Sequence, residues 1–324
     1  MGTHRVGADL LARSRVTGCM SARIVATALG LGVLLTAAPA HADTLETSGL
    51  GAQNIASAAG WQAWSTPLTD GTHRLRLRGP DGTVSTPVIG AFDAPVDPAI
   101  GTRGGADAIN TPASRRLSAI YSRCAGASQL RGCDVYALDL TTQVETKVTA
   151  LATRAYSETA PSLTFGNWSF VRRGSGPRTG TYSYLERSRS RRLVRLTPTM
   201  ARETASTQGR MALTYRSSRG FGVQIRKASG QDGALIAASG LESEPTSPQI
   251  TRYRVGWLEP GPAATRVLLS DRYLGSENRQ FPLNVHAAQR TLPAGVRSAA
   301  GDASALFTRY ANAIGIHRID PAIG

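Results

Sequence analysis

Lysine and charge are both scarce in this chain of 324 residues, although its formal net charge is +15. Only two of its 37 basic residues are lysines, Lys147 and Lys227, and 18% of all residues are charged. Proteins that bind nucleic acid usually use both cations, because lysine serves phosphate as a point charge. The bias toward arginine is instead typical of a high-G+C coding sequence. The charge therefore does not indicate a nucleic-acid partner, and a hydrophobic content of 41% excludes a disordered chain.

Local motifs of catalysis are absent as well. The sequence has no GxSxG segment, which would present a nucleophilic serine, and no HExxH segment, which would bind zinc. Of its five histidines, three follow residue 42, namely His73, His286 and His317. A Ser–His–Asp triad needs a histidine beside a positioned serine, and no local pattern provides that pair. We therefore expect no catalytic residue, no metal and no cofactor.

Long apolar runs are also missing after the first 42 residues, so we expect no membrane span in the mature chain. The apolar run at 24–38 follows Arg23 and has the length of a signal-peptide core. Small residues at 40 and 42 fit a cleavage site after Ala42. We therefore expect residues 1–42 to be a signal peptide and the mature protein to be secreted. Met20 begins a compact signal of its own and is an alternative start.

Cysteine is rare, with three in the chain. Cys19 precedes the apolar run, whereas a lipoprotein cysteine would follow it. Cys124 and Cys133 lie between two strand-like segments, LSAIYS and DVYALDL, and would face each other at the end of a hairpin. In an exported protein this arrangement predicts a disulfide, which stabilises the fold by about 2–3 kcal/mol. A redox or metal pair is the alternative, but eight residues separate the cysteines and no histidine is near them.

Aromatic residues make up only 6% of the chain, yet they are regularly placed. Short β-branched and aromatic segments recur along residues 43–324 between Gly, Asp and Pro clusters. The unit at 158–197 divides into four strands, and similar units flank it. One aromatic falls near the end of the second strand in each unit: Trp64, Tyr121, Phe170, Tyr215, Trp257 and Phe307.

Six units of four strands predict an all-β fold, a six-bladed β-propeller of four-stranded antiparallel blades that spans residues 43–324 as a single domain. Four strands cannot bury both faces of a sheet alone, whereas radial packing of blades buries them. The last unit lacks a fourth strand, and residues 44–50 precede the first unit. We therefore expect residues 44–50 to provide the outer strand of the last blade and so to close the ring.

Two segments give the repeat a family likeness. Asp134–Asp139 reads DVYALD, and Arg195–Thr197 reads RLT. These resemble the third and fourth strands of TolB-like, WD40-like propeller repeats. The phrases at 121–124 and 132–134 also resemble a group of exported actinobacterial propellers of unassigned function. The resemblance implies a propeller used for binding, and it implies no shared reaction. TolB has an additional N-terminal domain that this chain has no room for, so its periplasmic role is not carried over.

Acidic residues precede several predicted first strands. Glu158, Glu203 and Glu244 occupy similar places, and Asp93 or Asp97 would be the counterpart in the second unit. First strands line the channel of a propeller, so these carboxylates would gather around one mouth. Such a ring would receive a cation or the basic end of a peptide. The alternative is that each carboxylate caps local N–H groups or pairs with an arginine.

Basic residues are densest at 186–195, where Arg187, Arg189 and Arg191 alternate with serine and would share one face of a strand. Such a face is either an anion-binding edge or a charged edge that discourages pairing between molecules. No aromatics are interleaved there to stack on bases, so a nucleic-acid partner is not expected.

Together these features predict an exported, non-catalytic propeller that binds a protein, a peptide or a cell-envelope component through its channel face. We expect it to be a monomer. The alternative is an extracytoplasmic enzyme, of lyase or glycoside hydrolase type, with its site at the channel mouth. Propeller enzymes assemble sites from several blades, which local motifs do not reveal. A third possibility is a structural propeller whose partner covers an outer face.

Overall fold

The computed structural model divides the chain into two compact units, Met1–Ala40 and His41–Gly324. Every described residue belongs to the second unit, so the predicted signal peptide, its cleavage site and Met20 lie outside the described residues. No helix long and apolar enough to cross a membrane occurs in the described part. The residues described are 44–47, 53–103, 116–126, 132–186, 192–207, 209–231, 235–250, 255–262, 264–269, 288–293, 296–301, 306–310 and 316–319.

The described strands form six antiparallel sheets of four strands each. The first three sheets follow the chain from its innermost strand outward. They are β2 (Gln53–Ala58), β3 (Trp61–Pro67), β4 (His73–Arg78) and β5 (Val84–Ser85); β6 (Ala99–Arg103), β7 (Arg116–Cys124), β8 (Cys133–Asp139) and β9 (Glu145–Lys147); and β10 (Ser157–Thr164), β11 (Asn167–Arg173), β12 (Gly180–Leu185) and β13 (Arg192–Thr197).

The other three sheets repeat this plan, except that the last one takes its fourth strand from the other end of the chain. They are β14 (Thr204–Thr207), β15 (Arg210–Ser217), β16 (Gly220–Lys227) and β17 (Leu235–Leu241); β18 (Thr246–Ile250), β19 (Val255–Pro260), β20 (Ala264–Leu269) and β21 (Ala288–Pro293); and β22 (Val296–Gly301), β23 (Leu306–Tyr310), β24 (Ile316–Ile319) and β1 (Thr44–Thr47).

Tight hairpins join the strands within a sheet. Between β10 and β11, Thr164 pairs with Asn167, and the turn consists of Phe165 and Gly166. Their φ angles are 48° and 73°, which is the left-handed pair that a two-residue type I′ turn requires. Glycine adopts this conformation without strain, so the sequence places Gly at the second turn position.

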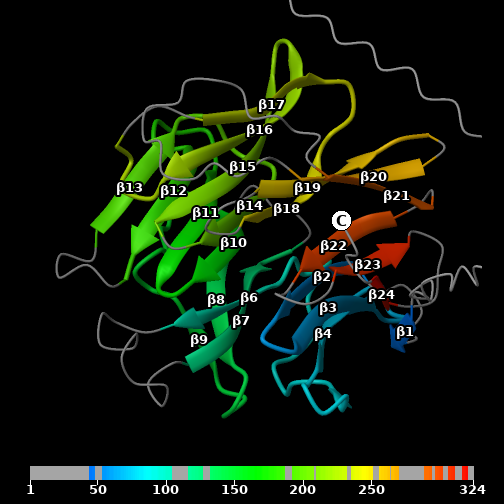
Figure 1. Ribbon diagram of the computed structural model, residues 1–324. Helices are drawn as coiled ribbons and strands as arrows, with labels where there is room; N and C mark the ends of the chain where they lie inside the picture. The colour runs from blue at the N-terminus through cyan, green and yellow to red at the C-terminus, as the bar shows by residue number, and fades with distance from the viewer. Residues whose placement is uncertain are drawn as a thin grey trace, which may run out of the picture. The chain divides into compact units, whose positions relative to one another are not determined.

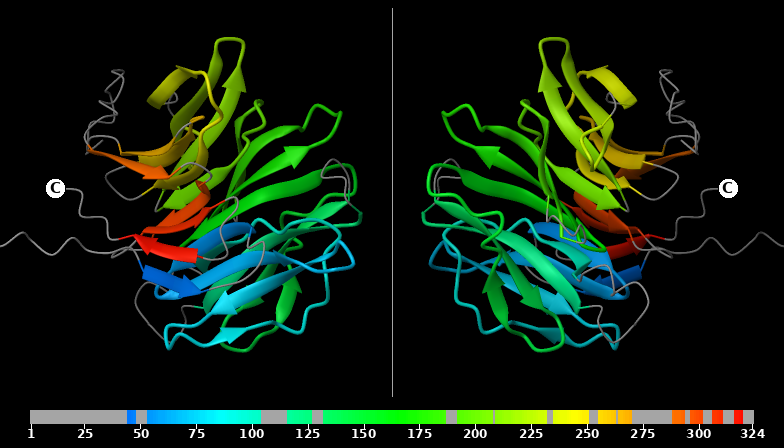
Figure 2. Two further views of the ribbon diagram at one scale, coloured as in Figure 1. Left: turned by 90° about the vertical axis from the view of Figure 1, so that its right-hand side faces the viewer. Right: turned by 90° about the vertical axis from the view of Figure 1, so that its left-hand side faces the viewer.

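The strand β1 pairs antiparallel with β24, with Thr44 opposite Arg318 and Leu45 opposite His317. Figure 2 shows this pairing as a blue strand beside a red one at the edge of the last sheet. Residues from the start and the end of the second unit are therefore joined in one sheet. Residues 48–50, which we also expected in this strand, lie outside the described residues.

The first strand of each sheet contacts the first strand of the next, in the order β2, β6, β10, β14, β18 and β22, and β22 contacts β2 again. Figure 1 shows these strands around the middle of the unit, with β13, β17 and β21 toward its periphery. Sheets that share an inner ring in this way form a β-propeller of four-stranded antiparallel blades. Its first strands line the centre, where ligands reach several blades at once.

Neighbouring sheets pack their faces together, and each core lies between two of them. One cluster joins Leu75 and Leu77 of β4 to Tyr121 of β7, and the next joins Ile120 of β7 to Trp168 of β11. Phe92 meets Tyr121 edge to face, with ring centroids 5.5 Å apart. Since successive residues of a strand point to opposite faces, β7 contributes to both cores through adjacent side chains.

The aromatic repeat marks these cores in four of the six units, because Trp64, Tyr121, Phe170 and Trp257 are buried. The position of Tyr215 differs. The second strands begin at Asn167, which pairs with Thr164, and at Arg210, which pairs with Thr207. Phe170 is three residues after Asn167, so its equivalent is Leu213, which is fully buried. Tyr215 lies two residues further along and is only partly buried. The side chain of Phe307 lies outside the described residues.

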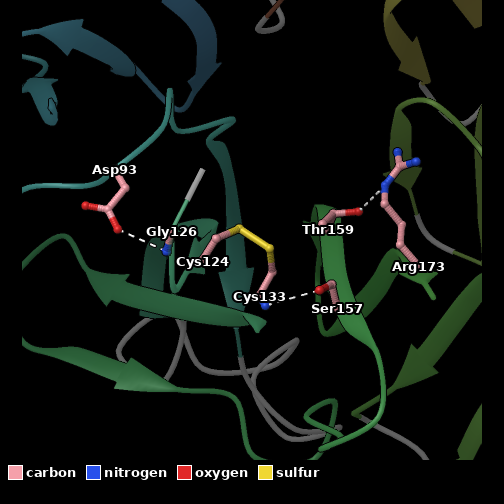
Figure 3. The surroundings of a disulfide bond; sticks show 7 residues. All are labelled: Asp93, Cys124, Gly126, Cys133, Ser157, Thr159 and Arg173. Atoms are coloured by element: carbon pink, nitrogen blue, oxygen red, sulfur yellow. Dashed lines mark hydrogen bonds between the residues drawn. A yellow bond between two sulfur atoms is a disulfide. The ribbon is translucent and has the colours of Figure 1, made fainter. Parts of the chain in front are cut away.

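The predicted disulfide between Cys124 and Cys133 is present, and the two residues pair directly at the end of the β7–β8 hairpin. Figure 3 shows it between the loop that carries Asp93 and the strand that carries Ser157 and Thr159. The amide of Cys133 donates to Ser157 Oγ at 3.3 Å. The disulfide therefore anchors the hairpin end of the second sheet against the first strand of the third.

Candidate functional site

A cavity of about 230 Å³ lies among the first strands of five sheets, and we call it the channel cavity. Its lining comes from β2, β6, β10, β14 and β18 and from the residues that directly precede β6 and β14. In the described part of the chain the lining has two charged side chains, Asp97 and Glu203. This is the place where the propeller brings residues far apart in the sequence into one site.

Five segments of the chain line the channel cavity. The first lining residue of each segment is, in chain order, Asn54, Asp97, Ala160, Glu203 and Ser247. Asn54, Ala160 and Ser247 have φ angles of 47°, 48° and 49°. The pairing register shifts at all three of these residues. A bulge in the left-handed conformation bends a strand and redirects its side chains, so it shapes the channel mouth at three of the five positions.

Asp97 is exposed to solvent, although protein atoms surround its carboxyl. It makes no hydrogen bond or ion pair with any described residue. Burial raises the pKa of the Asp97 carboxyl from 3.8 to about 6, because crowding by protein replaces the water that would hydrate the charge. Asp97 is therefore an unpaired carboxylate that a ligand in the cavity can reach.

Glu203 is partly exposed and lies immediately before β14. Its Oε2 accepts a hydrogen bond of 2.6 Å from the amide of Ser247, in the neighbouring sheet. Burial, the charge of Asp97 and the charge of Glu244 together raise the pKa of the Glu203 carboxyl to about 8, and the Ser247 amide opposes them. The two carboxyls titrate as one coupled pair, because each proton lost makes the next loss harder.

Glu158 lies outside the channel lining. It is fully buried in β10 and forms an ion pair with Arg172 of β11, at 3.1 Å between Oε1 and Nε. Thr153 Oγ1 donates to the same oxygen at 2.9 Å. Burial raises the pKa of the Glu158 carboxyl, and Thr153 and Arg172 oppose that effect. Glu158 thus follows the alternative interpretation, in which a carboxylate pairs with an arginine.

Glu244 and Asp93 also lie outside the lining of the channel cavity. Glu244 pairs with Arg202 at 3.2 Å on a largely exposed surface. The carboxylate of Asp93 accepts a hydrogen bond of 3.0 Å from the Gly126 amide, beside the disulfide (Figure 3). Of the acids named in the sequence analysis, Glu203 and Asp97 are therefore the two that meet in the channel cavity.

The reason for this division is strand register. The bulge at Ala160 and Pro161 adds residues to β10, so Glu158 falls two positions before the lining residue Ala160. Glu244 falls three positions before Ser247, whereas Glu203 occupies the lining position itself. A shared X-Pro step was the available signal, because Asp97–Pro98 matches Ala160–Pro161 and Ser247–Pro248. This shared step would have identified Asp97, rather than Asp93, as the acid of the second unit that faces the cavity.

The remaining candidates contribute no chemistry to this site. No group of three His, Cys, Asp or Glu residues that could hold a metal ion occurs among the described residues. His73 begins β4, and its Nδ1 is buried without a hydrogen bond. His286, the arginines 187, 189 and 191, and the side chain of His317 lie outside the described residues.

The sequence matches no protein-family model, and no curated protein matches it significantly. Among solved structures it is similar to the fucose-specific lectin from Aleuria aurantia, at 10% identity and a TM-score of 0.52, over 86% of this chain and 95% of the lectin. The SapL1 lectin gives 11% identity, a TM-score of 0.50 and the same two shares. TolB from Acinetobacter baumannii gives 14% identity and a TM-score of 0.48 over 75% of this chain.

These likenesses concern the fold. This chain spans 55% of the length of the TolB chain, so TolB is a larger protein than the part it shares. The two lectins are each matched over 95% of their length. The class of protein that the fold defines is the β-propeller, and the site must be interpreted from its own residues.

Proposed function

We propose that this protein is a secreted, six-bladed propeller, closed by β1, that binds a protonated amine of a peptide or cell-envelope component in its channel cavity without catalysis. The disulfide supports an extracytoplasmic location, because structural disulfides persist in oxidising compartments. The contact ring of six first strands supports one closed propeller. The signal-like run at 24–38 agrees with export.

One observation carries the proposal. Asp97 and Glu203 are the charged side chains lining the channel cavity in the described part, and no arginine, lysine or histidine there balances them. Burial raises the pKa of both carboxyls, and the charge of Asp97 also raises the pKa of Glu203, so the two negative charges repel each other. An ammonium group placed between them relieves this repulsion and donates hydrogen bonds to the carboxylates, and hydrogen bonds between charged groups are the stronger kind. The cavity therefore favours cations over neutral or anionic groups.

The test is binding of a simple amine by isothermal titration calorimetry. Alanyl-alanine amide carries an ammonium group and no carboxylate, and its N-acetylated form lacks the ammonium. We expect the amine to bind at least tenfold more tightly than its acetylated form, and the double variant Asp97→Asn, Glu203→Gln to lose that preference. Glu242→Gln, a change of an exposed acid outside the cavity, should retain it. Equal affinity for both forms in the native protein would overturn the proposal.

A second function, glycoside hydrolysis, is favoured by the same two carboxyls. Glycosidases use a protonated carboxyl of raised pKa as the acid and a second carboxylate as base or nucleophile. Glu203, with a pKa of about 8, and Asp97, with a pKa of about 6, fit these roles. Turnover of a panel of cell-envelope glycans would establish this function, provided that Glu203→Gln abolishes the turnover and leaves glycan binding intact. No turnover in the native protein excludes it for that panel.

A further inference from the structure

A second, smaller cavity of about 70 Å³ adjoins the channel cavity, and we call it the side cavity. The two cavities share Asp97 and Ala160 in their linings. The side cavity extends past the disulfide residue Cys124 to two arginines, Arg173 and Arg202. Asp97 and Ala160 therefore border both the channel cavity and a space that two arginines line.

Arg173 ends β11 and is partly buried. Its Nε donates to Thr159 Oγ1 at 2.8 Å, as Figure 3 shows, and its Nη2 donates to the carbonyl oxygen of Ala201 at 3.4 Å. Both acceptors are neutral, and no carboxylate pairs with Arg173 among the described residues. Burial lowers the pKa of the Arg173 guanidinium, and the charge of Arg202 lowers it further. The charge of Glu244 opposes these two effects, but Glu244 forms its ion pair with Arg202.

The other charged residues that line the side cavity are Arg202, Asp93 and Asp97, and the first two already have a partner in the protein. Arg202 pairs with Glu244 at 3.2 Å, and Asp93 accepts the hydrogen bond from Gly126. Asp97 also lines the side cavity, yet it forms no ion pair with Arg173. Two unpaired and opposite charges thus line one small space without meeting. Unpaired charges in crowded surroundings are unfavourable, and a ligand that pairs with both removes that penalty.

We propose that the ligand of the channel is a small zwitterion, such as a free amino acid or a dipeptide, with its ammonium at Asp97 and Glu203 and its carboxylate at Arg173. This deepens the proposed function and rests on it. The combined space is modest beside the pockets of roughly 300–1,000 Å³ that hold drug-sized ligands, which favours a compact ligand. Arginine also suits a carboxylate, since its planar fork can donate two parallel hydrogen bonds.

The experiment compares alanine and alanyl-alanine with their C-terminal amides and their N-acetylated forms, by calorimetry at low salt. For the native protein we expect each zwitterion to bind at least tenfold more tightly than its amide. Arg173→Gln should abolish this difference by weakening the binding of the zwitterion to the level of its amide. Arg173→Lys, which keeps the charge, should restore part of it. Arg219→Gln, which changes an exposed arginine away from both cavities, should leave every affinity unchanged.

The outcomes separate the two proposals. Amides that bind as tightly as the zwitterions, or a preference for zwitterions that survives Arg173→Gln, would overturn the zwitterion proposal and leave amine binding in place. Failure of every amine-bearing probe to bind would overturn the proposed function itself. Thermal unfolding of each variant shows whether it is folded, and Arg173→Met provides a second neutral variant if Arg173→Gln is not.

Discussion

Arg172 and Glu158 form a buried ion pair between β11 and β10, with Nε 3.1 Å from Oε1 and side-chain exposures of 6% and 0%. Arg172 also donates to the carbonyl oxygen of Leu151 at 3.0 Å, and its guanidinium lies 4.7 Å from the ring centroid of Tyr182. Every polar contact of this pair is with the protein itself. The carboxylate that first suggested a channel function therefore belongs to the core of the third sheet.

Replacing one member of this pair should destabilise the fold strongly. In Glu158→Gln the charge of Arg172 remains buried without its partner, which typically costs about 3–5 kcal/mol. Urea unfolding followed by tryptophan fluorescence measures the loss. Glu242→Gln should change the free energy of unfolding by less than about 0.5 kcal/mol, as surface substitutions usually do. A loss below about 1 kcal/mol for Glu158→Gln would show that the pair is not needed.

The coupled carboxyls predict how stability depends on pH. Their folded-state pKa values, about 6 for Asp97 and about 8 for Glu203, lie above the ordinary values of 3.8 and 4.5. The folded state therefore keeps protons that the unfolded state has already lost. Their contribution is fully present below about pH 4 and is lost as pH rises to about 8, and solvent screening reduces the share of the exposed Asp97.

The measurement is the difference in free energy of unfolding between the native protein and the Asp97→Asn, Glu203→Gln variant, at intervals from pH 4 to pH 8. We expect the variant to gain stability relative to the native protein as the pH rises, because its amides cannot ionise. Glu158 is present in both proteins and cancels. A difference that stays constant across this range contradicts the raised pKa values.

Removing the disulfide should have a smaller effect. The bond between Cys124 and Cys133 closes a loop of about ten residues, so the double variant Cys124→Ser, Cys133→Ser should lose about 2–3 kcal/mol of stability. Reductant should lower the stability of the native protein by a similar amount and leave that of the double variant unchanged. If reductant weakens both proteins equally, the disulfide is not the cause.

Gly101 lies where the second and third sheets are in contact, and there is no space for a side chain at this position. A Cβ added at Gly101 would overlap the carbonyl oxygen of Leu163, which belongs to the backbone of β10 and has no room to move aside. We expect Gly101→Ala to cost at least about 3 kcal/mol, at the upper end of overpacking effects. Gly71→Ala, where no atom lies within 4 Å but φ is +82°, should cost about 1–2 kcal/mol. Urea unfolding compares the two.

Much of the fold followed from local pattern. Strand segments such as DVYALD at 134–139, turn glycines such as Gly166, and the facing positions of Cys124 and Cys133 depend on residues that are near one another in the chain. Four of the six repeated aromatics are buried where one large residue per unit was expected. Tyr215 departs because Leu213 fills the equivalent core position, and either side chain satisfies the same hydrophobic pattern.

Less of the candidate site than of the fold could be predicted from the sequence. Of the acids that precede the first strands, Asp97 and Glu203 line the channel cavity, whereas Glu158, Glu244 and Asp93 do not. Which of those acids face the cavity depends on the bulges at Asn54, Ala160 and Ser247, because one extra residue changes the side-chain direction of everything before it.

Composition and periodicity were therefore enough to establish an all-β repeat with a hairpin disulfide, because strand propensity, turn chemistry and cysteine spacing act over a few residues. Only tertiary packing placed Asp97 and Glu203 in one cavity and paired Glu158 with Arg172. It also left Arg173 without an ion pair among the described residues. Each of these depends on the register between strands of different sheets or on the crowding of a charge. Neither the register between strands nor the crowding of a charge can be predicted from residues that are neighbours in the sequence.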